Sequence, residues 1–316
     1  MLQPNRLIRF IIICLFLFTG IGLVVGQTPA RAILLTVDGA IGPAVADYIQ
    51  RGIKTAEEQN ARLVIIKMDT PGGLDKSMRE INKAILTAAL PIVTYVAPSG
   101  ARAASAGTYI LYASHVAAMA PGTNIGAASP VSIGGDGGLT PPKQDNDKTK
   151  QPAKNSSATE KSSTMGKKVF NDAVAYIRSL AQLRGRNAQW AEQAVLEAKT
   201  LTAEEAKQQN VIEIVAKDIT DLVTQLNGRS VDIQGTKRLL DTQNLTVQQL
   251  DPDWRAKFLA VITDPSVAYI LLLIGVYGLF FEFANPGSLL LSFVDILPFL
   301  KEGDSYDVHF YCGSFR

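Results

Sequence analysis

Hydrophobic positions follow two periods along the first two thirds of the chain. Short apolar runs rich in β-branched residues predict buried strands at residues 33–37, 63–68, 92–96 and 116–120. Residues 43–59 and 77–89 lie between these runs and carry apolar side chains at helical spacing. Strands that alternate with helices favour a parallel sheet covered by helices, so we predict an α/β fold.

The same pattern resumes after a polar interruption. Residues 130–167 are glycine-rich and then polar, which is typical of a flexible loop that serves as a lid or binding loop. Helical periodicity begins again at Lys168. Further on, the sequence predicts a short helix opened by a capping box at Thr202 and Glu205, a strand at 211–215 and a helix at 221–226.

Both ends of the chain contain long apolar stretches. Arg6 and Arg9 precede the apolar residues 10–25, a pattern that indicates a secretory signal peptide cleaved near Gly26 or an uncleaved membrane anchor. Residues 260–283 are long and apolar enough to cross a membrane, and a further apolar run extends this region to residue 300.

Composition and net charge exclude several classes of protein. Of the 316 residues, 47% are hydrophobic and 19% charged, which is too apolar for disorder and agrees with membrane segments. The net charge of +2 gives no basis for nucleic-acid binding. Cys14 and Cys312 lie in terminal segments, so the central domain has no internal disulfide. A Ser-His-Asp triad would have to use His115 or His309, since the chain has 2 histidines.

Three stretches carry candidate chemistry. Ser105 follows a strand and a turn and begins a helix. The N–H groups at a helix start favour developing negative charge, so Ser105 is a candidate nucleophile. The alternative is that it only belongs to a helix packed tightly on the sheet. Gly72 and Gly73 follow a strand and either offer N–H groups to an oxyanion or only form a turn. Lys167 and Lys168 are expected at a helix start, which disfavours a charged amine, or they are a solvated pair.

Several motifs together resemble the long-form NfeD family of membrane-bound serine proteases, which is related to the ClpP/crotonase superfamily and to signal peptide peptidase A. The matching stretches are Asp38-Gly-Ala-Ile-Gly42, Met68-Asp-Thr-Pro-Gly-Gly73, Ser99-Gly-Ala-Arg-Ala-Ala-Ser-Ala-Gly-Thr-Tyr109, Met119-Ala-Pro-Gly-Thr-Asn-Ile-Gly-Ala127, Ala175-Tyr-Ile-Arg-Ser-Leu-Ala181, and Ile262-Thr-Asp-Pro265 with Phe283-Ala-Asn-Pro-Gly287.

This resemblance implies a ClpP/crotonase-like fold and a Ser–Lys dyad. Ser105 matches the family nucleophile and Lys168 the family base, with Lys167 as the second candidate. The backbone N–H groups of Gly73 and Ala106 would form the oxyanion hole, and Gly72 would shape the turn. The family uses neither cofactor nor metal, so none is expected.

The resemblance also implies a setting for the reaction. The expected substrate is a hydrophobic segment of a partner membrane protein, and stomatin-like proteins are the partners that the resemblance implies. The protein would be membrane-bound, with its protease domain extracytoplasmic (periplasmic or cell-exterior), and at least a homodimer. Two alternatives stay open: a non-catalytic membrane scaffold for a stomatin-like partner, and a crotonase-type acyl-CoA enzyme.

The expected domains follow from these observations. Their bounds are 1–32 for the signal or anchor, 33–227 for the protease domain, 228–259 for a connector, 260–300 for the transmembrane region and 301–316 for an atypical tail. The family pattern fades soon after Gly287, and we interpret the tail as the product of a truncated or frameshifted reading frame.

Overall fold

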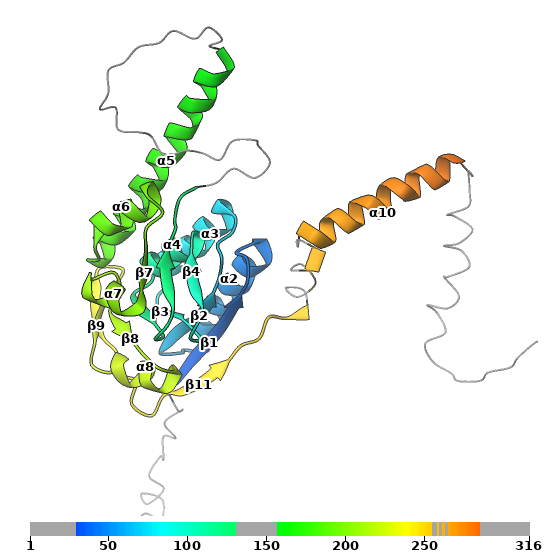
Figure 1. Cartoon of the computed structure of the whole chain (residues 1–316). Helices are drawn as coiled ribbons and strands as arrows, with labels where there is room; N and C mark the ends of the chain where they lie inside the picture. The colour runs from blue at the N-terminus through cyan, green and yellow to red at the C-terminus, as the bar shows by residue number, and fades with distance from the viewer. Residues whose placement is uncertain (1–29, 131–156, 255–257, 259–260, 263–264, 285–316) are drawn as a thin grey trace, which may run out of the picture. The chain divides into compact units, whose positions relative to one another are not determined.

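The computed structural model describes residues 30–130, 157–254, 258, 261–262 and 265–284 (Figure 1). The predicted signal or anchor, most of the predicted loop and the predicted tail lie outside these residues. Within them, one compact unit extends to Asp251 and a second begins at Pro252.

A six-stranded sheet forms the centre of the first unit, and all its neighbouring strands are parallel, as predicted. Its strands lie in the order β11, β1, β2, β3, β5, β8. Their bounds are β1 Arg31–Asp38, β2 Leu63–Asp69, β3 Ile92–Val96, β5 Val116–Met119, β8 Ile214–Val215 and β11 Thr246–Gln249. Loops that follow β2, β3 and β5 therefore meet at the carboxyl edge of the sheet, where α/β proteins place their sites.

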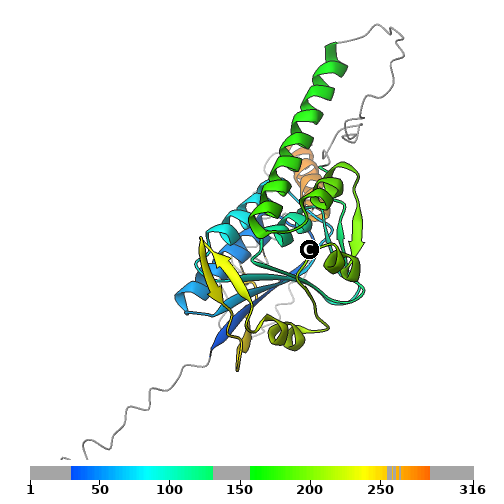
Figure 2. The same cartoon turned by 90° about the vertical axis from the view of Figure 1, so that its left-hand side faces the viewer.

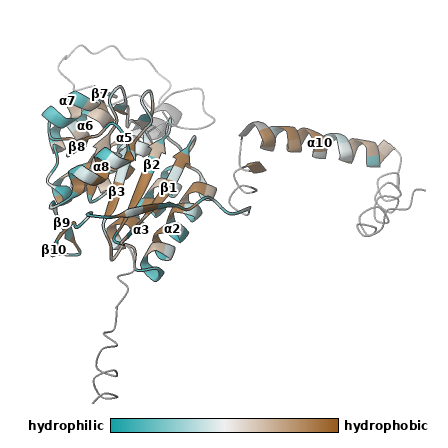
Figure 3. Ribbon diagram, turned by 90° about the horizontal axis from the view of Figure 1, so that it is seen from below, coloured by the Kyte–Doolittle hydropathy of each residue, from teal (hydrophilic) through white to brown (hydrophobic). Residues whose placement is uncertain are grey.

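Helices cover both faces of this sheet. They are α2 Pro43–Glu58, α3 Asp75–Thr87, α4 Ala106–Ala113, α5 Ser157–Arg184, α6 Ala188–Leu196, α7 Ala203–Gln208 and α8 Ile219–Leu226. Figure 3 shows α8 on one side of the strands and α2 and α3 on the other. The packing is close, since a methyl group added at Gly52 of α2 would come within 2.6 Å of Leu35 in β1.

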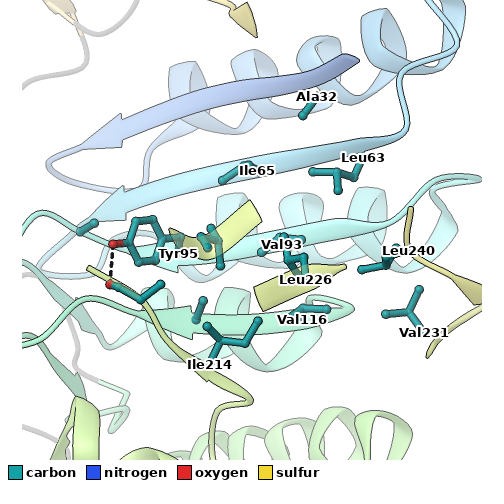
Figure 4. Close-up of a cluster of buried hydrophobic side chains, with 14 of the residues drawn as sticks. Ala32, Leu63, Ile65, Val93, Tyr95, Val116, Ile214, Leu226, Val231 and Leu240 are labelled. Atoms are coloured by element: carbon teal, nitrogen blue, oxygen red, sulfur yellow. Dashed lines mark hydrogen bonds between the residues drawn. The ribbon is translucent and has the colours of Figure 1, made fainter. Parts of the chain in front are cut away.

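Alternate residues of the strands build a core under α8 (Figure 4). Leu63 and Ile65 of β2 and Val93 and Tyr95 of β3 belong to this cluster, and all four are buried. The Tyr95 hydroxyl donates a hydrogen bond to the carbonyl of Ala216 at 2.8 Å, the dashed line in Figure 4. Strands buried on both faces read as continuous apolar runs, which is why the sequence predicted them well.

A second sheet supports the loops at the carboxyl edge. It contains β4 Arg102–Ala104, β6 Asn124–Gly126 and β7 Thr200–Thr202 in the order β4, β6, β7. Thr70, just beyond β2, forms a bridge with Ala103 and joins this sheet to the main one. We predicted a helix that begins at Ser105; the residues before it pair with β6 as strand β4 up to Ala104, and α4 begins directly after Ser105.

The long helix α5 begins earlier than its periodicity indicated. We predicted a loop up to residue 167, yet α5 starts at Ser157 and, in Figures 1 and 2, extends beyond the body of the unit. Residues 157–168 contain no proline, and a helix nucleated on its packed half extends at little cost. Lys167 and Lys168 therefore lie inside the helix and not at its start, so the expected helix-terminus effect on their charge is absent.

The segment that we expected to be a connector belongs largely to the first unit. The strands β9 Ser230–Ile233 and β10 Thr236–Leu239 form an antiparallel hairpin, and β11 pairs with β1. The sequence pattern missed this because the strands are only four residues long, and β10 and β11 are mostly exposed, with few apolar residues to reveal their period. The unit thus extends to Asp251, beyond the predicted end at 227.

The described part of the second unit is mainly the helix α10, Pro265–Ala284. Residues Val267–Ala284 are long and apolar enough to cross a membrane, and none of this window is buried within the protein. Figure 3 shows brown, hydrophobic colouring over most of the helix. This agrees with a C-terminal membrane span in the predicted region.

Candidate active site

Ser105 lies at the junction between β4 and α4, where the backbone is strained. Its φ of 50° and ψ of −116° fall outside the regions that non-glycine residues ordinarily occupy. The surrounding structure holds this conformation: the Ser105 N–H donates to the Gly126 carbonyl at 3.0 Å, and the Thr108 N–H donates to the Ser105 carbonyl at 3.0 Å. Strain maintained in this way is found at functional sites.

The Thr108 side chain reinforces the junction. Its buried hydroxyl lies 2.9 Å from the Ala103 carbonyl and 3.0 Å from the Gly126 carbonyl, so it links β4, α4 and β6. The Ser105 side chain caps no helix N–H group, and it is only partly buried. Its Oγ is thus available to react while the backbone beneath it is fixed.

The turn after β2 packs directly against this serine. A methyl group at Gly72, whose φ is +121°, would lie 2.6 Å from Ser105 Cβ. A methyl group at Gly73 would lie 2.1 Å from the Ile41 carbonyl oxygen. Both positions therefore require glycine, one for conformation and space and the other for space.

Two backbone N–H groups point to an oxyanion role. Ala106 occupies the first position of α4, where an N–H group has no acceptor inside the helix. Gly73 lies in the turn, and in the part of the chain that the structure describes neither its N–H nor that of Ala106 donates to a protein acceptor. Free N–H groups beside a nucleophile are the elements of an oxyanion hole.

Ser105, Gly73, Ala106 and Lys168 line one cavity of about 500 Å³. The remaining lining is mostly apolar with a few charged groups: Leu74, Asp75, Met78, Arg79, Tyr109, Ala128, Ser129, Pro130, Val169, Asp172 and Ala173. Lys167, the second candidate base, is not among the lining residues. Both lysines are exposed in this structure, which agrees with the alternative of a solvated pair, and Lys168 has no buried surroundings.

The charged groups of this cavity include residues that the sequence did not single out. Arg79 on α3 donates to Asp75 at 2.9 Å and to Asp172 on α5 at 2.5 Å. Its guanidinium also lies 4.4 Å from the ring centroid of Tyr176. Arg79 and Asp172 are 93 residues apart, and no local pattern relates them. The sequence signal for this contact was the presence of opposite charges on the faces of the two predicted helices.

The far end of α4 is held by two arginines. Arg186 is bidentate to Glu213, at 2.8 and 2.9 Å, and it also donates to the carbonyls of Leu111 and Tyr112 at 3.0 Å each. Arg184 donates to the carbonyl of Ala113 at 2.8 Å. Cations at a helix C-terminus satisfy its last carbonyls and oppose its negative end. These contacts fix the helix that carries the serine at its other end.

The described histidine has a structural role. His115 Nδ1 accepts the N–H of Ile92 at 3.1 Å, and burial together with Arg184 and Arg186 lowers the pKa of His115 to about 3. It does not line the cavity of Ser105. Among the described residues, no group of three acidic, histidine or cysteine side chains is placed to hold a metal ion.

The sequence of the chain matches a known protein family and two curated proteins. A family model described as the N-terminal domain of NfeD1b matches residues 32–236. The membrane-bound protease PH1510 of Pyrococcus horikoshii is 40% identical over 256 residues, which are 79% of this chain and 52% of that protein. The membrane protein NfeD1b of Bacillus subtilis is 35% identical over 97 residues, 30% of this chain and 21% of that protein. This chain therefore spans about half the length, or less, of these curated relatives.

Solved structures match the same region. One is the 1510-N membrane-bound stomatin-specific protease with a serine replaced by alanine, with a TM-score of 0.59, 37% identity, and coverage of 71% of this chain and 99% of that one. Another is that protease with a lysine replaced by alanine, in complex with a substrate peptide, with a TM-score of 0.60, 36% identity, and coverage of 74% and 99%. These matches establish the fold of the first unit.

Proposed function

Since the chain belongs to the NfeD1b family through its N-terminal domain, we propose that it is a membrane-bound serine endopeptidase with Ser105 as nucleophile and Lys168 as base. The observation that carries this proposal is the shared cavity, which joins both side chains to the Gly73 and Ala106 N–H groups. The similar proteases, in which a serine and a lysine have been replaced, support the same pairing.

The chemistry is acyl transfer. Ser105 Oγ attacks the peptide carbonyl while the Lys168 amine takes its proton, and the lysine later gives that proton to the leaving amine. The N–H groups of Gly73 and Ala106 stabilise the tetrahedral oxyanion, each by about 3–4 kcal/mol in comparable sites. Gly72 shapes the turn that presents the Gly73 donor. Water then hydrolyses the acyl-enzyme.

Because Lys168 is exposed, we infer that the bound substrate itself shields the amine from water. Leu74 and Val169 are exposed and line the cavity together with Met78, which suits an apolar peptide segment. Such a segment would cover the amine when it binds and exclude water, which favours the uncharged form that a base requires. We infer that the substrate is a hydrophobic segment of a stomatin-like membrane protein, in keeping with the stomatin-specific relatives.

Cleavage by the full chain tests this proposal. A peptide from an apolar segment of a stomatin-like protein should be cut by the unmodified chain, and Ser105→Ala and Lys168→Ala should each lower kcat at least about 10³-fold. Lys167→Ala is the matched control and should keep cleavage within about threefold. Full activity of Ser105→Ala would refute the nucleophile, and an inactive Lys167→Ala beside an active Lys168→Ala would reverse the choice of base.

Assembly and orientation remain predictions. A homodimer, or a larger oligomer, should appear in light scattering of the detergent-solubilised chain. An extracytoplasmic protease domain should be digested by protease added to spheroplasts, whose outer layers are removed and whose cytoplasmic membrane is intact. A monomer, or a domain digested only after lysis, would contradict them.

A further inference from the structure

Arg79 makes an ionic bridge across the cavity, and the proposed dyad mechanism does not use it. Its Nε lies 2.9 Å from Asp75 Oδ2 on the same helix, and its Nη2 lies 2.5 Å from Asp172 Oδ2 on α5. The face of its guanidinium lies over the ring of Tyr176. One cation thus occupies two carboxylates that belong to two different helices.

Asp172 is the carboxylate that bears on the base. It follows Lys168 by four residues on α5, so the two side chains share one face of the helix, and both line the cavity. A carboxylate in this position favours the ammonium form of a lysine, which cannot accept the proton of Ser105.

The titratable groups that line the cavity together with Lys168 come from three helices. The helix α3 contributes Asp75 and Arg79, α4 contributes Tyr109, and α5 contributes Asp172. The segment after β6 contributes Ser129, which is uncharged. Burial raises the pKa of Tyr109, so its phenol stays neutral. Among the described residues that line this cavity with Lys168, the charged ones are therefore two carboxylates and the arginine that pairs with both.

We propose that Arg79 is a positioning residue that neutralises Asp172 and Asp75 and thereby keeps Lys168 able to act as a base. The inference rests on the proposed function, because it assigns a role relative to that base. Arg79 also ties α5 to α3, so it holds the helix of Lys168 beside the cavity. The electrostatic effect of Arg79 on Lys168 and its structural effect as a link between α3 and α5 can be measured separately.

Rate profiles against pH measure the effect of the charge. In the full chain, Arg79→Gln should raise the midpoint of the acid limb of kcat/KM by about 0.15–0.35 pH units, which is the coupling typical of charges one helical turn apart. The shift in kcat should be larger, since bound peptide excludes water and strengthens the coupling. Arg79→Lys, which keeps the charge, should shift the midpoint by less than about 0.1. The double variant Arg79→Gln/Asp172→Asn should return to within about 0.1 of the unmodified chain.

A second measurement does not depend on cleavage. Lysines carrying ¹³C-methyl groups titrate visibly by NMR, and the Lys168 signal is assigned by its loss in Lys168→Arg. Its midpoint should rise by the same 0.15–0.35 units, roughly, in Arg79→Gln and fall by a similar amount in Asp172→Asn. The matched control is Arg178→Gln, which removes an arginine on α5 that pairs with Glu192 outside the cavity, and it should leave the midpoint unchanged.

The outcomes separate this proposal from the proposed function. An unmoved Lys168 midpoint in Arg79→Gln overturns it, even if the chain cleaves peptide. A drop in rate without a change in midpoint would give Arg79 a purely structural role and also overturn it. A moved midpoint in a chain that cleaves no peptide would remove the peptidase proposal and leave the coupling between Arg79 and Lys168 in place.

Discussion

Replacement of Arg186 by methionine tests whether the ion pair behind α4 holds the fold. The Arg186 side chain is 1% exposed, against 23% for Glu213, and it makes four hydrogen bonds to the carboxylate and to two carbonyls at the end of α4. Methionine is similar in length but donates no hydrogen bond, so the Ala117 N–H at 2.6 Å is the one donor left to the Glu213 carboxylate among the described residues. Glu213 then becomes a largely buried, unpaired charge.

The expected loss is large because of burial. Removing one partner of a buried pair typically costs about 3–5 kcal/mol, out of a total stability of about 5–15 kcal/mol. Arg178→Met removes the other arginine–glutamate pair of this region, whose arginine is 45% exposed, and should cost less than about 1 kcal/mol. Adding Glu213→Gln to Arg186→Met should recover at least about 1 kcal/mol, since the unpaired charge is gone.

The chain offers a reporter for this measurement. It contains two tryptophans, and Trp190 is buried and stacks on Tyr112 of α4 with ring centroids 6.1 Å apart. In a Trp254→Phe background, urea unfolding followed by fluorescence therefore reports on the packing around α4. If Arg186→Met lost no more free energy of unfolding than Arg178→Met, the reasoning from burial would be refuted.

Two further predictions concern stability against pH and the oxyanion hole. His115 has a folded-state pKa of about 3, below its unfolded value near 6.5, so its contribution is fully present above pH 6.5 and is lost as the pH falls toward 3. His115→Asn keeps an acceptor for the Ile92 N–H and should weaken this pH dependence. The free energy of unfolding in urea should therefore differ less between pH 7.5 and pH 5 in this variant than in the unmodified chain, and an equal difference would contradict the assignment. Gly73→Ala should displace the turn from Ile41 and lower kcat in the peptide assay about 10²–10³-fold with little change in KM. Gly42 has open space around it, so the control variant Gly42→Ala should keep a rate near that of the unmodified chain. Equal rates for the two variants would argue against the Gly73 N–H as an oxyanion donor.

Much of the fold was accessible from the sequence because its signals are local. The strands β1, β2, β3 and β5 are apolar runs, and their positions were predicted to within one or two residues. The capping box at Thr202 and Glu205 was also confirmed, since it depends on two residues one turn apart. The neighbourhood of Ser105 followed from its strand–turn–helix pattern.

What could not be predicted depends on contacts between distant residues. The bridge from Arg79 to Asp172 joins helices that are far apart in the chain, and exposed charges carry no periodic signal. The start of α5 was missed because residues 157–168 contain few apolar residues from which a helical period can be read. The pairing of β11 with β1 was missed for the same reason, since β11 is exposed along most of its length.

That last pairing constrains the order in which the nascent protein matures. The strand β1 is made first, yet its outer neighbour β11 is made last, more than two hundred residues later by position in the sequence. Until residue 250 has left the ribosome, one side of β1 presents unpaired backbone groups, which are a template for aggregation. Recombinant fragments that stop near residue 227 would keep this edge open permanently, whereas fragments that extend through Asp251 would close it.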